Sequence, residues 1–416
     1  MSYAPNMLFA RRIPLSRRSG CSPIEPSFDV ESRWDAPDNQ EQMIPNDPSQ
    51  MRGPRYNSAV KHLHALTGIR YFAALYVAIY HFVPVQSLPP IVQTLCKAGF
   101  MGVSLFFILS GFIMYYNYAR KADGLSKRSY WIVRFARIYP IYAIAMLISM
   151  PGFAKEAFGS IGKIFSPEFV PHFLARFLVV HSWFPQFSER WNTPSWSLAC
   201  EAFFYFLFPF IIPLAVRWSR VQTLAIYAAC CVLALASPLI AEVGQLDHAS
   251  AAFKFLYYSP IMHLPQFVAG IALARIFVER YVVIEKYALP SFFSAVLVIF
   301  ALSIVFMEHT IFTQCGVMIV PFSVVILSLA SGENLISNFF ASNTMQLLGD
   351  ASYSLYILHS PIHGFMQKVM PALDAKNGSL SAALFIYLPT ITLISVAAYY
   401  VVEKPARTAI RKWAKV

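Results

Sequence analysis

The stretch HALTGIRYFAALYVAIYH, from His64 to His81, is apolar enough to enter a bilayer, yet it carries Arg70 and His81. Ionisable side chains inside a membrane segment are costly and usually functional. The two residues are eleven positions apart. At about 100° and 1.5 Å per residue they share nearly one helix face, about 16 Å apart along the axis. We expect this face to point into the protein and the rest of the chain to surround it.

The composition is that of a polytopic membrane protein. The chain has 416 residues, of which 57% are hydrophobic and only 13% charged, whereas a soluble protein carries about 25% charged residues. The net charge of +12 comes from basic residues at the ends of apolar segments, where membrane topology requires them, so we expect no nucleic-acid partner. The six cysteines do not indicate a disulfide framework, and no metal-ligand spacing suggests a metal.

The hydropathy pattern predicts an all-α transmembrane bundle of about ten helices. Most of the apolar segments approach the ~20 residues that a bilayer requires, and they lie at 65–84, 101–118, 138–152, 196–216, 221–241, 254–275, 287–306, 311–330, 350–367 and 380–402. A weaker run at 169–184 is expected to be interfacial or re-entrant. Residues 1–62 are polar and Pro-rich and predict a disordered cytoplasmic tail. The membrane domain is expected over 63–407, followed by a basic cytoplasmic tail at 408–416.

The distribution of Lys and Arg predicts the orientation of the bundle. With the N-terminus inside, and with Lys254 and Arg275 at the ends of their span counted with the adjacent loops, 24 of the 33 basic residues are cytoplasmic and 8 outside, while Arg70 lies within a span. This excess predicts that both termini face the cytoplasm of a multi-pass protein of the plasma (inner) membrane.

The Arg70–His81 helix supports two interpretations. In the functional one, His81 is a general base that takes a hydroxyl proton, and Arg70 holds a phosphate, a carboxylate or the far end of the substrate. In the structural one, Arg70 snorkels to the inner interface and His81 sits at the outer one. The shared helix face favours the functional interpretation.

Glu201, in the segment WSLACEAFFY, is the second buried ionisable candidate. It lies about 7 Å into a span entered from outside, at a depth similar to that of His81 in its own span. A buried carboxylate needs a partner, and His81 is the predicted one. A hydrogen bond to Trp191, Trp196 or the backbone is the structural alternative.

Four further features are candidates for functional residues, and each also has a simpler structural explanation. Arg134 and Arg137 close a basic cytoplasmic loop predicted over 120–137 and could bind phosphates, although topology alone also explains them. Ser110 belongs to the small-residue segment GFMGVSLFFILSGF, where helix packing is the simpler reading. His359 lies at mid-depth in its span and could equally line a pocket or serve packing. Glu403, at the inner end of the last span, is expected to pair with an arginine.

These segments together resemble the acyltransferase-3 family of integral membrane proteins, which includes O-acetyltransferases of bacterial surface polysaccharides. The resemblance covers about residues 62–407 and rests on six blocks in the same order: LTGIRYFAALYVAIYHF with its Arg-x10-His spacing, GVSLFFILSGF, RFARIYP, WSLACE, SYSLYILH and VEKP. It implies a cytoplasmic acyl-CoA donor and a hydroxyl acceptor. It also implies that His81, Arg70 and Glu201 are catalytic-site residues and that Arg134 and Arg137 contact the donor. The family's Asp-Gly-Leu-Arg is here Thr67, Gly68, Ile69 and Arg70, so the acid is missing.

The sequence therefore predicts a membrane O-acyltransferase that transfers acetyl from acetyl-CoA to a carbohydrate, with His81 as base and Glu201 orienting it. Cys200 and Ser110 are the residues that could carry a covalent intermediate. Two alternatives stay open: a transporter that holds a polar substrate at Arg70, His81 and Glu201, and an acyltransferase whose acceptor is a small secreted metabolite or a lipid.

Overall fold

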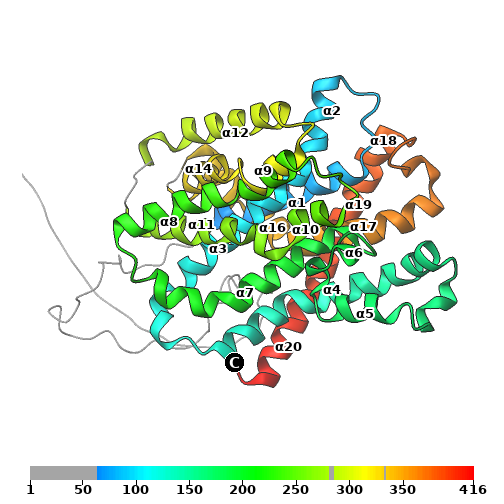
Figure 1. The fold of residues 1–416 in the computed structure, drawn as a ribbon, viewed down its shortest axis with the longest axis horizontal. Helices are drawn as coiled ribbons and strands as arrows, with labels where there is room; N and C mark the ends of the chain where they lie inside the picture. Colours follow the sequence, from blue (N-terminus) through cyan, green and yellow to red (C-terminus); the bar gives the residue numbers. More distant parts are fainter. Residues whose placement is uncertain (1–62, 281–284, 332–333) are drawn as a thin grey trace, which may run out of the picture. The chain divides into compact units, whose positions relative to one another are not determined.

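The computed structural model describes residues 63–280, 285–331 and 334–416. Throughout these ranges the regular elements are helical, which confirms the predicted all-α class (Figure 1). The tail predicted for residues 1–62 lies outside the described residues.

The helices follow one another closely along the chain. Their bounds are α1 His64–Phe82, α2 Pro90–Lys97, α3 Gly102–Tyr118, α4 Lys127–Phe158, α5 Val170–Phe177, α6 Pro185–Ser188, α7 Trp196–Ala215, α8 Arg220–Leu233, α9 Ala236–Val243, α10 Ala251–Tyr258, α11 Pro260–Val278, α12 Ala288–Val305, α13 Thr310–Cys315, α14 Ile319–Ala330, α15 Leu335–Ala341, α16 Asn343–Asp350, α17 Ser352–Val369, α18 Leu380–Ala382, α19 Leu388–Ala398 and α20 Lys404–Ala414.

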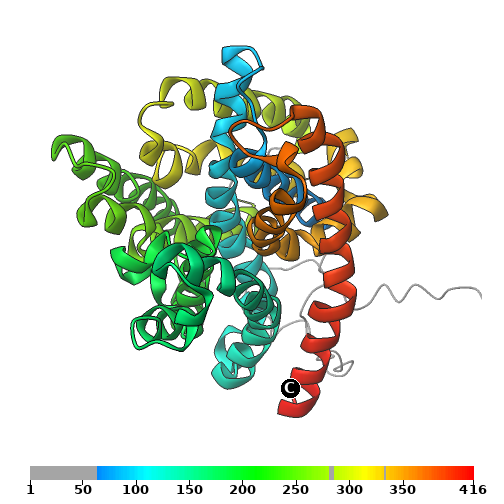
Figure 2. The ribbon, with the colours of Figure 1, turned by 90° about the vertical axis from the view of Figure 1, so that its right-hand side faces the viewer.

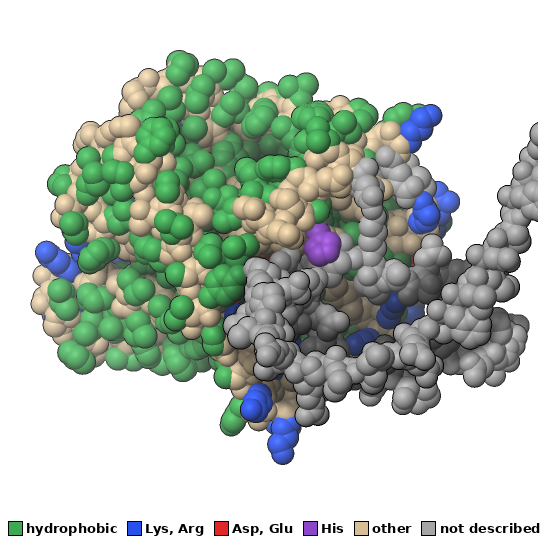
Figure 3. All heavy atoms as spheres, turned by 180° about the vertical axis from the view of Figure 1, so that it is seen from behind, with side chains coloured by type: hydrophobic (Ala, Val, Ile, Leu, Met, Phe, Trp, Pro, Cys, Tyr) green, Lys and Arg blue, Asp and Glu red, His purple; other side chains and the backbone are tan. Residues whose placement is uncertain are grey.

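In the part of the chain that the structure describes, eight helical stretches are long and apolar enough to cross a bilayer: 90–124, 127–158, 193–215, 220–243, 251–278, 288–305, 310–330 and 380–414. Helices α1 and α17, with 19 and 18 residues, are long enough but more polar, and they are not among the eight. The polytopic character is therefore confirmed, while the count of ten spans stays a prediction. Hydrophobic side chains are spread over the uncovered part of the face in Figure 3, and Lys and Arg lie mainly toward its edges.

Helix α1 lies inside the bundle, as its polar stripe predicted. Ala74, Val77 and Ala78 are almost fully buried, and the helix packs against α3, α15, α16 and α17. The small residues of α3 allow its close packing. A Cβ on Gly111 would collide with the Phe267 carbonyl of α11, and one on Gly270 would collide with the Ile108 carbonyl of α3. The packing interpretation of the small-residue segment is confirmed for Gly111.

The basic segment before Arg137 differs from the prediction. A cytoplasmic loop was expected over 120–137, but α4 begins at Lys127, where Ser126 caps it by accepting a hydrogen bond from the Ser129 amide at 3.4 Å. Helix α4 extends to Phe158 despite Pro140 and Pro151. Arg134 and Arg137 are therefore held on a helix, one turn apart.

The chain between α5 and α7 turns back into the bundle. Helix α5 has 8 residues, too few to span a bilayer, as expected for an interfacial or re-entrant run. Pro361 has no N–H for the Ile357 carbonyl four residues earlier in α17, so that acceptor is free. Asn192 Nδ2 donates to it at 2.9 Å. A proline in α17 thus creates the anchor for the segment that leads into α7.

The last helix is one continuous rod from α18 to α20, which Figure 2 shows in red along one side of the bundle. Two π-helical turns interrupt its α-helical pattern, at Ala383–Tyr387 and Tyr399–Glu403. Such turns re-aim side chains and are frequent at functional sites. Here they aim Tyr387 and Glu403 at the two polar regions described next.

Candidate active site

Two polar regions lie along α1, and each takes one residue from it. The first, which we call the imidazole pair, consists of His81 and His359. The second, which we call the arginine–carboxylate cluster, consists of Arg70, Arg137, Glu201 and Glu403. Arg70 and His81 are eleven residues apart, so the regions are about 16 Å apart along the helix axis.

The hydrogen bonds of His81 fix its tautomer. Its Nδ1 lies 2.9 Å from the Val77 carbonyl oxygen in the preceding turn of α1. A carbonyl oxygen can only accept, so Nδ1 carries the proton in the neutral imidazole. The other nitrogen, Nε2, then has a free lone pair. This is the arrangement that a general base requires.

His359 completes this arrangement from α17. Its Nδ1 donates to the Tyr356 carbonyl oxygen at 2.6 Å, so its Nε2 is an acceptor in the neutral ring. That Nε2 lies 3.2 Å from His81 Nδ1. The Nδ1–H of His81 is therefore shared between Val77 and His359, and both rings take the same tautomer. His359 is fully buried, whereas His81 is half-buried.

Aromatic and carbonyl contacts hold the imidazole pair in place. The Phe82 ring centre lies 5.7 Å from the ring centres of both His81 and His359. Phe82 also stacks on His363, whose Nε2 donates to the Leu373 carbonyl at 2.8 Å. Tyr387, on the first π-helical turn, donates to the His359 carbonyl at 3.0 Å. These contacts come from three separate segments and limit the rotation of the pair.

The arginine–carboxylate cluster joins α1, α4, α7 and the last helix. Arg70 and Arg137 both interact electrostatically with Glu201 and with Glu403. Glu403 also accepts a hydrogen bond from Ser354 Oγ at 3.0 Å and forms an ion pair with Arg407 at 3.6 Å. The expected pairing of Glu403 with an arginine is thus present. Buried charges are retained where opposite charges and hydrogen bonds compensate them, as they do here.

A hydrogen-bonded chain leads from α3 into the cluster. Ser110 Oγ donates to the Tyr205 hydroxyl at 3.2 Å, and that hydroxyl donates to Glu201 Oε1 at 3.4 Å. Sequence reasoning missed Tyr205, although its position one turn after Glu201 on α7 was a usable signal. Ser110 therefore contributes to the cluster through Tyr205.

Arg134 occupies a cage of tyrosines next to the cluster. It is only 6% exposed, and its Nη2 donates to the Tyr118 hydroxyl at 2.9 Å. Its guanidinium carbon lies 5.4 to 5.7 Å from the ring centres of Tyr118, Tyr130 and Tyr205. It also lines a cavity of about 160 Å³ between α4 and α7. Arg137 is half-buried and faces the carboxylates.

The predicted Glu201–His81 pair is not formed. Among the described residues, His81 has Val77 and His359 as hydrogen-bond partners, and Glu201 has Tyr205. Glu201 belongs with Arg70 instead. The prediction assumed that α7 starts at the membrane surface, but Ser188, Asn192 and Ser195, which precede α7, are already buried inside the bundle. His359, named from sequence only as a pocket-lining residue, occupies the place expected for Glu201.

Cys200, a further sequence candidate, is not a hydrogen-bond partner of the imidazole pair among the described residues. Cys200 is fully buried and its Sγ points to the Tyr258 carbonyl at 3.6 Å. Within the described ranges, Cys200 and the other cysteines are free thiols. No group of three or more His, Cys, Asp or Glu in that part of the chain has an arrangement that could hold a metal.

Comparison with known proteins agrees with this architecture. Residues 63–400 match the acyltransferase domain of the acyltransferase-3 family. Acyltransferase MdmB of Streptomyces mycarofaciens is 28% identical over 377 residues, which are 83% of this chain and 92% of MdmB. O-acetyltransferase OatA of Staphylococcus aureus is 24% identical over 393 residues, which are 86% of this chain but only 58% of OatA. No solved structure matches the chain significantly.

Proposed function

Since the chain belongs to the acyltransferase-3 family, we propose that this multi-pass membrane acyltransferase moves an acetyl group from cytoplasmic acetyl-CoA to a carbohydrate hydroxyl at the plasma membrane. The similarity to OatA supports an O-linked acetyl product. The observation that carries the proposal is the free Nε2 of His81, fixed by the bonds of Nδ1 to Val77 and His359.

In the proposed reaction His81 acts on the acceptor. Its Nε2 takes the hydroxyl proton as the acceptor oxygen attacks the thioester carbonyl. The carbon–sulfur bond then breaks, the sugar ester forms, and the leaving thiolate takes the proton back from the imidazolium. One proton moves from the acceptor to CoA, so the step is balanced. His359 accepts from Nδ1–H throughout and keeps Nε2 directed at the substrate.

The arginine–carboxylate cluster is the proposed donor site. Arg137 and Arg134 would bind the CoA phosphates, since guanidinium forks match phosphate oxygens. Arg70 would hold the donor between these phosphates and His81. CoA carries its thioester at the end of a long pantetheine arm, which is consistent with a separation of about 16 Å along α1.

The same geometry supports direct transfer rather than a covalent enzyme intermediate. Cys200 is buried against the Tyr258 carbonyl, and Ser110 is hydrogen-bonded to Tyr205 beside the cluster. Neither is a hydrogen-bond partner of His81 within the described residues. A nucleophile activated by His81 would have to be within its reach.

Mass spectrometry of surface glycans from cells with and without the protein tests this proposal. We expect ester-linked acetate on carbohydrate only when the protein is present, together with consumption of acetyl-CoA by purified membranes. Acetyl-CoA consumption with the ester on a lipid or a secreted metabolite would instead identify the alternative acceptors. Absence of any acetyl transfer, with the protein correctly inserted, would contradict the proposal.

A further inference from the structure

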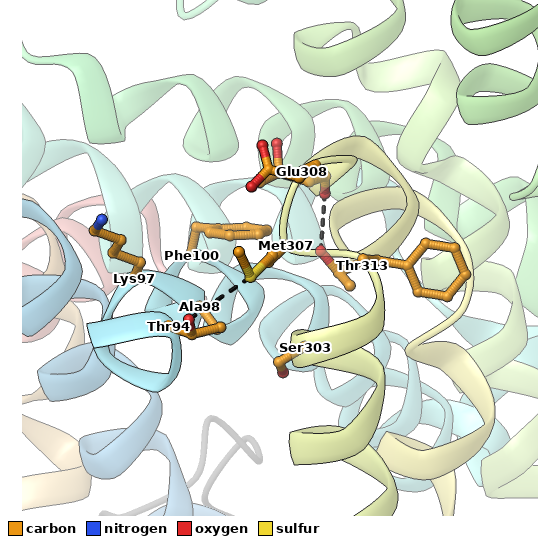
Figure 4. Close-up of a pocket in the computed structure, with 10 residues that line it drawn as sticks. Thr94, Lys97, Ala98, Phe100, Ser303, Met307, Glu308 and Thr313 are labelled. Atoms are coloured by element: carbon orange, nitrogen blue, oxygen red, sulfur yellow. Dashed lines mark hydrogen bonds between the residues drawn. The ribbon is translucent and has the colours of Figure 1, made fainter. Parts of the chain in front are cut away.

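A cavity of about 260 Å³ opens at the end of the bundle where α2 meets α12 and α13 (Figure 4). The Lys and Arg distribution predicts that this end faces outward. The cavity is a little smaller than the roughly 300 Å³ at which small-molecule sites begin, so it suits a single small ring. Its walls are held together by Thr94 Oγ1, which contacts Met307 Sδ at 3.7 Å.

The inner part of the cavity combines one aromatic ring with hydroxyl groups. Phe100, Ser303 and Thr313 are nearly buried there. Ser303 Oγ donates to Ile299 O at 2.6 Å, and Thr313 Oγ1 donates to Thr310 O at 2.9 Å. Because each hydroxyl proton is already used, their oxygens are left as acceptors for a ligand's hydroxyl groups.

The rim carries one cation and one anion. Lys97 extends from the α2 side and Glu308 from the α12–α13 side, and both are exposed. Neither has an ion-pair partner among the residues that the structure describes. An ammonium group donates and a carboxylate accepts, so the two can bind hydroxyls of an uncharged ligand in complementary directions. A sugar ring offers such hydroxyls at its edge and C–H groups on its faces for Phe100.

Two aromatic contacts connect this cavity to His81. The Phe100 ring packs against Tyr80 with centres 5.4 Å apart, and the Tyr80 ring packs against His81 at 4.7 Å. The segment that carries Phe100 is pressed onto α1, because a Cβ on Gly99 would collide with the Tyr76 carbonyl. The cavity is therefore built onto the end of α1 that carries the proposed base.

From this geometry we infer that the cavity of Thr94, Lys97, Phe100, Ser303, Glu308 and Thr313 binds one sugar unit of the acceptor. The inference rests on the proposed function and names the acceptor's binding site within it. The acceptor hydroxyl then reaches His81 past Tyr80, while the donor occupies the arginine–carboxylate cluster further along α1.

The test replaces Lys97→Met and Glu308→Gln separately and measures two quantities. One is ester-linked acetate on the surface carbohydrate of expressing cells. The other is the Kd of radiolabelled acetyl-CoA for the purified protein. Losing one hydrogen bond to a charged group corresponds to about a tenfold effect or more. We expect each variant to lower carbohydrate acetate at least about tenfold, with the acetyl-CoA Kd unchanged. Lys376→Met and Glu156→Gln, exposed charges outside the cavity, are the matched controls and should acetylate as wild type.

Three results would overturn the inference. Wild-type acetylation by both cavity variants would show that the cavity does not bind the acceptor. A loss of acetyl-CoA binding as large as the loss of carbohydrate acetate would show that these residues bind the donor or support the fold. Absence of carbohydrate acetate in the wild type itself, with acetyl-CoA still bound, would remove the proposed acceptor class and the inference with it.

Discussion

The imidazole pair and the arginine–carboxylate cluster share α1 but are stabilised in opposite ways. His81 and His359 are ordered by backbone carbonyls of Val77 and Tyr356, so neither ring needs a charge. The cluster balances arginines against Glu201 and Glu403. A neutral pair keeps a nitrogen lone pair for proton transfer, whereas a balanced set of charges can exchange a carboxylate for a phosphate. The difference assigns proton transfer to one region and donor binding to the other.

The largest expected effect comes from removing the proposed base. A general base contributes about 10²- to 10⁴-fold, so His81→Ala should lower acetyl transfer at least about 100-fold. His81→Gln should fare no better, since an amide can hydrogen-bond but cannot take the proton. Transfer per unit of membrane-inserted protein is the measurement. If His81→Gln keeps more than about a tenth of wild-type transfer, against that 100-fold minimum, His81 is not the base.

The second largest effect is expected at the proposed donor site, as a change in the KM for acetyl-CoA. Charged hydrogen bonds are worth about 1.5–3 kcal/mol, or about 10- to 150-fold. Replacing Arg134 and Arg137 together by Gln should therefore raise the KM for acetyl-CoA by that range and lower kcat less. Lys121→Gln, which removes an exposed cation from the same basic segment 120–137, is the control. An unchanged KM in a correctly inserted double variant would leave both arginines with only a topological role.

The third effect separates positioning from catalysis within the imidazole pair. His359→Leu removes the acceptor on α17 while the Nδ1–H of His81 still donates to the Val77 carbonyl. The loss is that of one neutral hydrogen bond, about 0.5–1.5 kcal/mol, or about 2- to 13-fold in kcat. His359→Gln offers an amide oxygen to that N–H and should recover part of the loss. The KM for acetyl-CoA should stay the same in both. Equal activity of the Leu variant and the wild type would show that His359 does not position His81.

The smallest effect is expected at the residues considered for a covalent intermediate. Cys200→Ala should leave transfer within about twofold of wild type, since its buried thiol is only a weak donor to the Tyr258 carbonyl. Ser110→Ala should cost little more, because it removes one neutral hydrogen bond worth about 1 kcal/mol. Loss of more than about 100-fold in either variant, as for a general base, with trapping of labelled acetyl on the wild-type protein, would contradict direct transfer.

The placement of Arg70 and His81 on α1 could be predicted from sequence, because it depends only on the geometry and polarity of a single helix. The spacing of Arg70 and His81 on one helix face follows from helix geometry alone. The exclusion of that face from lipid follows from the cost of buried ionisable groups. Both are properties of a single helix, and the structure places α1 inside the bundle accordingly.

Contacts between residues that are far apart in the sequence could not be predicted in this way. His81 and His359 are 278 residues apart, and their contact depends on how α17 packs. Glu201 was assigned the wrong partner because depth was counted along straight, separate helices. The segment before α7, which Asn192 anchors on α17, does not fit that assumption. The hydropathy pattern also gives no indication of the π-helical turns that direct Tyr387 and Glu403.

Equilibrium binding of radiolabelled acetyl-CoA to purified His81→Gln and Arg137→Gln proteins tests the division between the two regions most directly. The account predicts that His81→Gln binds acetyl-CoA with the wild-type Kd although its transfer is reduced at least about 100-fold. Arg137→Gln should bind at least about tenfold more weakly. If His81→Gln loses acetyl-CoA binding as Arg137→Gln does, the imidazole pair is part of the donor site and the division is incorrect.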